Sequence, residues 1–227
     1  MIDINKTLDI IKLKFYNEWL YASHLYDEAE TDIHKRITSE VVKNYVDPLE
    51  LPKDANILDI GCSVGYFLDE MRERGYTKVV GTTLSETNAK QCRDRGHTVK
   101  EYDPSFIPHA EGYHDESVDF IFLRHTLHHS PYPIFSLIEY NRLLKEKGKI
   151  YIEVPAPDCA RGHEYNKNHY SIMGARQLDA LLQRTGFKVD KMNDIDFEIK
   201  TGTEDDSVVM EKYFCIVATK TGPLDIK

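Results

Sequence analysis

Residues 57–65 read ILDIGCSVG, a short apolar run that leads into a glycine-rich turn. An apolar run of this length, interrupted only by Asp59, is typical of a buried strand, and Gly61 and Gly65 indicate a turn into a following helix. Glycine has no Cβ, so a ligand can lie directly against such a turn. Ligands of open α/β sheets bind outside the carboxyl ends of the strands. The segment therefore predicts an α/β sheet with a ligand site at the end of its first strand.

The alternation of short apolar strands and amphipathic helices continues toward the C-terminus. Strands are expected at residues 78–81, 98–102, 118–123, 149–154, 187–190 and 213–219. Helices are expected at residues 66–75, 86–95, 132–147 and 175–185, each ended by a glycine: Gly75, Gly96, Gly148 and Gly186. The last two strands have no helix between them, so one of them must be antiparallel. We predict an α/β fold with a Rossmann-like, doubly wound sheet that is mostly parallel and has an antiparallel last strand.

The chain upstream of this sheet is predicted to be helical. Apolar side chains recur at helical spacing over residues 7–22 and again over residues 33–45, and Asp47-Pro48 ends the second stretch. We therefore expect residues 1–50 to form an N-terminal helical extension and residues 51–227 to form a single compact domain.

Composition and charge narrow the classes of function. The 227 residues carry a net charge of −9, with 41% hydrophobic and 30% charged residues, which is globular composition. The negative charge argues against a nucleic-acid partner, because phosphate binding needs a basic surface. No apolar run reaches the roughly 20 residues that cross a bilayer, no signal peptide is recognisable, and the four cysteines form no C-x-x-C pair. We expect a cytoplasmic protein with a small-molecule partner and no membrane partner; the oligomeric state stays open.

Two general interpretations of the glycine turn can be weighed from the residues alone. A nicotinamide-dinucleotide site needs a third glycine three residues after the second, and the turn lacks it. Residues 61–65 do match G-x-S-x-G, the nucleophile elbow of α/β-hydrolases, with Ser63 as the nucleophile. That elbow normally follows several strands, whereas the sequence upstream is helical by periodicity. An esterase that uses Ser63 is therefore an alternative rather than the first interpretation.

A third interpretation accounts for more of the chain. Residues 57–65 resemble the first motif of class I S-adenosylmethionine-dependent methyltransferases of the small-molecule type, whose pattern is hydrophobic-hydrophobic-Asp-hydrophobic-Gly-Cys-Gly-x-Gly. Segments similar to the later family motifs follow in family order at residues 79–85, 102–108, 117–121, 127–131 and 144–150. Six weak motifs in order and at family spacing make a specific resemblance, which covers residue 50 to the C-terminus. It implies that S-adenosylmethionine is the cofactor and S-adenosylhomocysteine the product, and that the N-terminal helices form a lid.

The sequence departs from the family pattern at two positions of the cofactor site. Ser63 replaces the central glycine, which we expect to be tolerable if its backbone φ stays negative. Thr83 stands where an acid usually holds both ribose hydroxyls, so affinity could fall by ~1–2 kcal/mol because a neutral hydrogen bond replaces charge-assisted ones. The resemblance nonetheless implies these cofactor-binding residues: Asp59, Gly61, Cys62, Ser63, Gly65, Thr83, Leu84, Asp103, Arg124 and His125.

Candidate catalytic residues follow from the chemistry of methyl transfer. A hydroxyl or amine acceptor must lose a proton, and histidine is the natural base near neutral pH. His129, in the loop after the fourth strand, is our first candidate and His128 the second, while Tyr16 of the N-terminal extension is a candidate for contacting the acceptor. His125 and His129 are spaced i, i+4, and His163, Glu164 and His169 come later, but the loop context does not favour a helical pair, so we predict no metal site.

The predicted function is methyl transfer from S-adenosylmethionine to a hydroxyl or amine of a small polar acceptor, with a sugar among the candidates. Residues 153–171 should form a long loop that governs acceptor specificity, and residues 204–206 a solvated hairpin tip. The alternatives from other classes are the Ser63 esterase and a cofactor-binding protein without turnover.

Overall fold

The structure is a computed structural model that describes residues 29–103, 114–200 and 208–222 of the chain. The predicted helix at residues 7–22, the candidate catalytic residue Tyr16 and the predicted hairpin tip at residues 204–206 lie outside the described residues. Among the described residues, no helix combines the length and the apolar character that crossing a membrane requires.

In the part of the chain that the structure describes, seven strands form one sheet in the order β3-β2-β1-β4-β5-β7-β6. Their bounds are β1 Ile57–Ile60, β2 Val79–Thr82, β3 Thr98–Lys100, β4 Val118–Arg124, β5 Leu144–Pro155, β6 Phe187–Lys200 and β7 Val208–Lys220. The first five strands pair in parallel, while β7 is antiparallel to both β5 and β6. The predicted doubly wound sheet with an antiparallel last strand is therefore confirmed.

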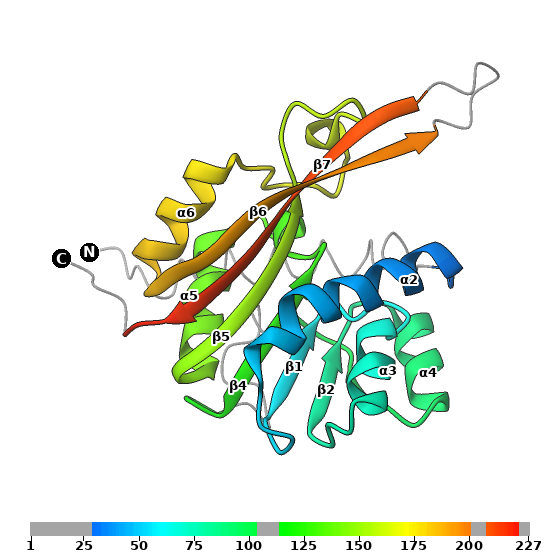
Figure 1. Ribbon diagram of the computed structural model, residues 1–227, viewed down its shortest axis with the longest axis vertical. Coiled ribbons are helices and arrows are strands. Elements are labelled where there is room, and N and C mark those ends of the chain that lie inside the picture. Colours follow the sequence, from blue (N-terminus) through cyan, green and yellow to red (C-terminus); the bar gives the residue numbers. More distant parts are fainter. Residues whose placement is uncertain (1–28, 104–113, 201–207, 223–227) are drawn as a thin grey trace, which may run out of the picture.

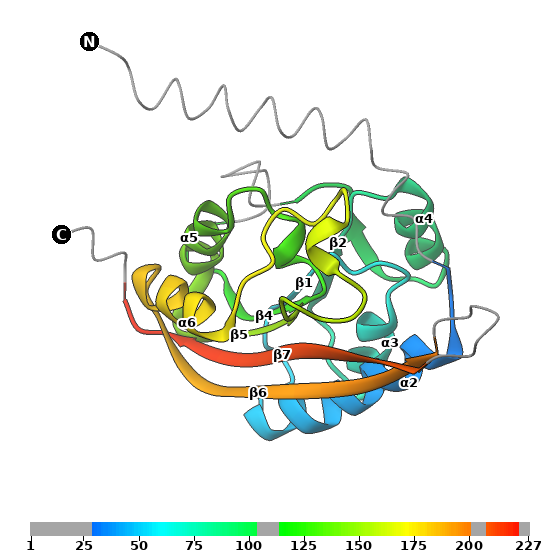
Figure 2. The same cartoon turned by 90° about the horizontal axis from the view of Figure 1, so that it is seen from above.

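Helices cover both faces of this sheet, and each face has its own hydrophobic core (Figures 1 and 2). One core is formed with α5 (Pro133–Leu143) and α6 (Ala175–Arg184), and the other with α3 (Tyr66–Glu73), α4 (Glu86–Asp94) and the segment that follows α2 (Asp32–Val41). Tyr140 and Leu182 are fully buried on the first face, and Met71 and Ala89 on the second. Central strands covered on both sides explain why β1 and β4 read as nearly continuous apolar runs.

The described part of the N-terminal extension packs onto this second core. Thr31 caps α2 by accepting a hydrogen bond from the His34 N–H at 3.1 Å. A π-helical turn (Val42–Val46) and a 3-10 turn (Asp47–Leu49) carry the chain to Glu50, whose φ of +49° ends the helical stretch two residues after Pro48. The division of the chain into an extension and a domain at residue 50 stays a prediction.

The sequence-based boundaries are wrong around Gly148. Helix α5 ends at Leu143, and β5 begins at Leu144, which has an extended ψ of 137° and pairs with Val118. Gly148 therefore does not cap the helix but lies within β5, where the pairing of β5 with β4 shifts register, next to Lys147 at φ +61°. A Cβ at Gly148 would lie 2.8 Å from the Lys145 carbonyl oxygen, which explains the glycine by close approach of the backbone.

The last two strands are also longer than predicted. The expected strands covered residues 187–190 and 213–219, whereas β6 and β7 pair along 187–200 and 208–220. Figure 1 shows the far end of this hairpin projecting beyond the body of the sheet. The polar residues beyond position 190 hid the strand from a search for apolar runs.

Candidate functional site

Two cavities lie side by side at the carboxyl ends of the central strands. Cavity 1 is lined by Ile60, Gly61, Ser63, Thr82, Thr83, Leu84, Tyr102, Asp103, His125, Thr126 and His129. Cavity 2 is lined by Ala29, Thr31, His34, Thr38, Asp59, Gly61, Cys62, Ser63, Tyr66, Phe67, Phe122, Arg124 and His125. Both cavities include Gly61, Ser63 and His125, so the glycine turn separates them and belongs to each.

The glycine turn has left-handed backbone at alternate residues. Gly61, Ser63 and Gly65 have φ values of +77°, +49° and +83°. The N–H groups of Gly61 and Cys62 both donate to the Thr82 carbonyl oxygen, at 2.9 and 2.8 Å, which ties the turn to the end of β2. Ser63 therefore does not meet the condition of a negative φ under which we expected its replacement of the central glycine to be tolerable. A serine in this conformation costs about 1 kcal/mol.

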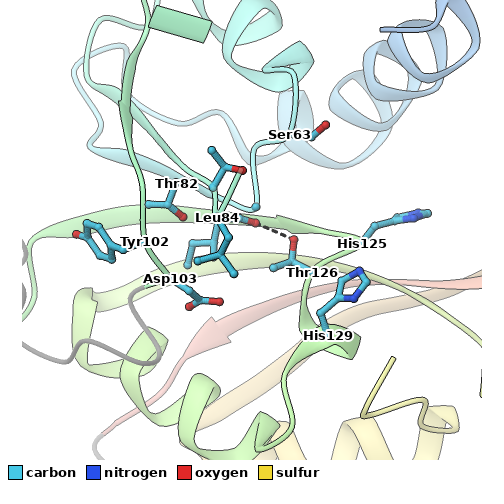
Figure 3. Close-up of a pocket in the computed structure, with 11 residues that line it drawn as sticks. Ser63, Thr82, Leu84, Tyr102, Asp103, His125, Thr126 and His129 are labelled. Carbon is cyan, nitrogen blue, oxygen red and sulfur yellow. Dashed lines mark hydrogen bonds between the residues drawn. The ribbon is translucent and has the colours of Figure 1, made fainter. Parts of the chain in front are cut away.

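Cavity 1 holds several buried polar groups around an apolar wall (Figure 3). Asp103 is only 5% exposed, and Figure 3 shows its carboxylate beneath Leu84. The Thr82 hydroxyl is buried and has no hydrogen-bond partner among the described residues. The Thr83 hydroxyl accepts a hydrogen bond from the Ser85 N–H at 3.2 Å, so it also supports the turn after β2. Thr82 and Tyr102 are lining residues that the sequence analysis missed.

Cavity 2 combines a buried acid, Asp59, with a partly buried cation, Arg124. Asp59 is 3% exposed, and its burial raises the pKa of its carboxyl, which the nearby Cys92 also raises and the charge of Arg124 lowers. Helix α2 closes this cavity from the other side, where Arg124 Nη1 donates to Thr38 Oγ1 at 3.4 Å. A ligand group that carries both charges would match this pair.

A buried carboxylate orients Arg124, the last residue of β4, and His125, which follows it. Glu153 Oε1 accepts a hydrogen bond from Arg124 Nε at 2.9 Å and lies 2.6 Å from His125 Nε2, while Tyr151 donates to Glu153 Oε2 at 2.6 Å. Burial opposes ionisation of this carboxyl, but Arg124 and His125 together lower its pKa to about 2. Sequence reasoning missed this role of Glu153; its available signal was an acid within an apolar strand.

The candidate catalytic histidines occupy different positions. His129 lines cavity 1, and its Nδ1 lies 2.8 Å from the Asn168 carbonyl oxygen. Burial lowers the pKa of His129 to about 4. His128 is 3% exposed and lines neither cavity. Both belong to the 3-10 turn η4 (Leu127–His129), and His125 has a φ of +54°, so His125 and His129 do not share a helical face.

The predicted long loop does follow β5 and returns to these histidines. It runs from the end of β5 to α6, with one 3-10 turn, η5 (His163–Tyr165). The N–H groups of Tyr170 and Ser171 both donate to the His128 carbonyl oxygen, at 2.9 and 3.0 Å. The loop is thereby fixed beside cavity 1.

Most of the predicted cofactor residues are brought together. Nine of them border at least one cavity: Asp59, Gly61, Cys62, Ser63, Thr83, Leu84, Asp103, Arg124 and His125. Gly65 borders neither cavity; it precedes α3, and a Cβ there would lie 2.7 Å from Cys92 Sγ. The geometry does not test the roles themselves, which stay predictions.

Comparison with known proteins agrees with this architecture. A family model described as "Methyltransferase domain" matches residues 31–192. A tRNA U34 carboxymethyltransferase of Aliarcobacter butzleri (strain RM4018) is 30% identical over 170 residues, which cover 70% of this chain and 56% of that protein. The 27-O-demethylrifamycin SV methyltransferase of Amycolatopsis mediterranei (strain S699) is 23% identical over 185 residues, which cover 76% of this chain and 68% of that protein.

Solved structures share the fold at low sequence identity. A SAM-dependent methyltransferase from Archaeoglobus fulgidus superposes with a TM-score of 0.64 at 18% identity, covering 82% of this chain and 94% of that chain. The family model spans well over half of the 227 residues. The chain therefore belongs to the methyltransferase-domain family, the class I S-adenosylmethionine-dependent methyltransferases.

Proposed function

We propose that this chain transfers a methyl group from S-adenosylmethionine to a hydroxyl or amine of a small polar acceptor, with a sugar hydroxyl as the first candidate. The observation that supports this most directly is that cavities 1 and 2 share Gly61, Ser63 and His125. A ligand with an adenosine end and a methionine end could lie across the turn, with one end in each cavity. When bound, this cofactor supplies an activated methyl group.

Cavity 1 suits the adenosine end. Asp103 offers a buried carboxylate for an amino group of the base, and Leu84 offers an apolar surface for its ring. The buried Thr82 hydroxyl, which has no partner among the described residues, would gain one from a ribose or base nitrogen. Thr83 borders the same space, so a ribose contact with its hydroxyl remains part of the proposal.

Cavity 2 suits the methionine end. An amino acid carries an ammonium and a carboxylate, and Asp59 and Arg124 supply the two opposite charges within one cavity. A cationic group beside Asp59 would favour the ionised carboxylate that burial disfavours. Thr31 and Thr38 add hydroxyl groups from the α2 side.

His125 is better placed than His128 or His129 to accept the proton of the acceptor. A proton on His125 Nε2 is held by Glu153 at 2.6 Å, which leaves Nδ1 as the basic nitrogen in a ring that borders both cavities. His128 borders neither cavity, and the pKa of about 4 makes His129 a weak base at neutral pH. The catalytic roles predicted for His128 and His129 stay predictions.

The acceptor class rests on charge and on the relatives. A net charge of −9 disfavours a polyanion, and one relative is named for a methylated small molecule while another is named for tRNA. The chain spans only 56% of the length of that tRNA enzyme, so the likeness alone does not carry its substrate over to this chain. tRNA is therefore included in the acceptor panel as a competing outcome.

Calorimetry with S-adenosylhomocysteine tests the cofactor part. We expect binding by the wild-type chain and roughly five- to tenfold weaker binding by Thr82→Val, because one buried hydrogen bond is worth about 1 kcal/mol. Thr98→Val, on the exposed side of β3, is the matched control and should bind like the wild type. Absence of binding at high micromolar ligand would overturn the proposal.

Methyl transfer to sugars, small amines and tRNA tests the acceptor part. His125→Asn should lose about 10²–10⁴-fold in turnover, whereas S-adenosylhomocysteine binding should weaken by far less than that. Transfer to tRNA alone would replace the proposed acceptor class. Cofactor binding without product from any acceptor would favour the non-catalytic alternative.

A further inference from the structure

Three imidazoles from two segments of the chain lie close together just after the end of β4. His128 and His129 belong to the η4 turn, and His169 comes from the long loop after η5. Their ring centroids are 4.2 Å apart for His128 and His129, 4.4 Å for His128 and His169, and 4.9 Å for His129 and His169. One ring nitrogen from each residue lies within 4.8 Å of the other two.

His128 presents a buried polar atom that needs a partner. The residue is 3% exposed, and its Nδ1 has no hydrogen-bond partner among the described residues. A buried polar atom left in this state costs about 1–3 kcal/mol, so its retention calls for a ligand.

The other two rings are held as metal ligands are held. The Nδ1 of His129 lies 2.8 Å from the Asn168 carbonyl oxygen, and the Nδ1 of His169 lies 3.0 Å from the His163 carbonyl oxygen. A carbonyl can only accept, so each Nδ1 carries the proton and each Nε2 carries the lone pair. Histidines that bind metals almost always donate their second ring N–H in this way.

The two neighbouring histidines are engaged differently. His125 Nε2 lies 2.6 Å from Glu153 Oε1, and His163 Nε2 lies 2.6 Å from Glu211 Oε2. Glu153 and Glu211 are both buried, so two carboxylates lie one imidazole away from the three-histidine cluster. Their negative charge would offset part of the charge of a cation at the cluster.

We propose that His128, His129 and His169 bind one divalent transition-metal ion of the class that prefers imidazole, with Zn²⁺ as the test ion. Bonds of about 2.0–2.1 Å require the three nitrogens to approach one another more closely than in the present arrangement. The ion joins the long loop to the η4 turn beside cavity 1, adding to the backbone hydrogen bonds that Tyr170 and Ser171 donate to His128. Three protein ligands leave a position for water or for an acceptor hydroxyl.

The test uses the full chain without an affinity tag, stripped of metal with a chelator. Calorimetric titration with Zn²⁺ should give one ion per chain, and Co²⁺ should give the visible absorption of a nitrogen-bound site. His169→Ala should weaken Zn²⁺ binding by about 100-fold or more, since loss of a direct ligand costs more than loss of its supporting hydrogen bond. His114→Ala, at an exposed histidine outside the cluster, is the matched control and should bind as the wild type does.

A second variant keeps the test independent of folding. His169→Cys should restore Zn²⁺ binding and add a thiolate-to-Co²⁺ charge-transfer band that the wild type lacks. The proposal is overturned if the wild type binds no Zn²⁺ at micromolar concentration, or if His169→Ala and His114→Ala bind it equally. Because these measurements use no cofactor or acceptor, their failure is distinguishable from failure of the proposed methyl transfer.

Discussion

The two regions that border cavity 1 are built in different ways. The glycine turn after β1 is one continuous stretch of five residues, 61–65, and it contributes Gly61 and Ser63 to both cavities. The histidine region is assembled from three distant segments: the η4 turn, the loop after β5 and the first part of β7, where Glu211 is paired with His163 at 2.6 Å. One region depends on backbone conformation, and the other on side chains that meet only after folding.

The two regions also differ in the ionisable side chains that they bury. Asp59 is buried directly before the glycine turn, and Asp103, which follows β3, is buried at the edge of cavity 1; both carboxylates would suit a ligand with cationic and amino groups. The histidine region buries neutral rings, and its carboxylates Glu153 and Glu211 are each bonded to a histidine. The site proposed for the cofactor thus depends on local backbone, whereas the histidine region depends on long-range contacts.

Gly61→Ala should produce the largest effect, because it breaks the turn region alone. Alanine at φ +77° is strained, and its Cβ would collide with the Thr126 hydroxyl that donates to the Ile60 carbonyl oxygen at 2.9 Å. We expect the free energy of unfolding to fall by roughly 3–5 kcal/mol, measured by urea unfolding, with loss of S-adenosylhomocysteine binding.

Gly75→Ala is the matched control for that substitution. Its φ of +81° is equally left-handed, but a Cβ there has no atom within 4 Å. It should cost only about 1–2 kcal/mol and leave ligand binding intact. Equal effects of the two substitutions would mean that the turn is not specially packed against Thr126.

Glu153→Gln tests the histidine region, because it removes the negative charge that pairs with Arg124 and His125. Removing the charge leaves Arg124, whose side chain is only 17% exposed, without its carboxylate, so we expect a loss of about 2–3 kcal/mol at pH 7. The folded pKa of Glu153 is about 2 and the unfolded value 4.5, so the stabilising effect of its ionisation is complete above pH 4.5. That effect is lost as the pH falls from 4.5 toward 2, and the difference between variant and wild type should shrink over this range.

Urea unfolding at pH 7 and at pH 3 measures this convergence. Glu146→Gln, at an exposed position two residues before Gly148, is the matched control. It should change the free energy of unfolding by less than about 0.5 kcal/mol at either pH. A difference between Glu153→Gln and wild type that stays constant with pH would contradict the ionic role of the carboxylate.

The contrast between local backbone and long-range side-chain contacts also explains which features could be predicted from the sequence. The order of strands and helices followed from apolar periodicity, and nine cofactor candidates fell at the cavities because each lies in or just after a strand. The end of α5 was misplaced because a glycine after a helical stretch usually marks a helix cap. Gly148 instead allows the backbone to approach the Lys145 carbonyl oxygen closely, and the sequence does not distinguish the two roles. Glu153 and the His128–His129–His169 cluster depend on partners more than twenty residues away, and no local pattern encodes such pairs.

Ser63→Gly should have the smallest effect on stability. It also separates the methyltransferase interpretation of the glycine turn from the esterase interpretation. Glycine adopts φ +49° without the steric cost that serine bears, so the variant should be more stable by up to about 1 kcal/mol in urea unfolding. A methyltransferase that uses the backbone of this turn should retain S-adenosylhomocysteine binding and turnover in the variant. An esterase that uses the Ser63 hydroxyl should lose all activity while keeping the added stability. Destabilisation instead would show that the serine side chain supports the turn by more than its backbone strain costs.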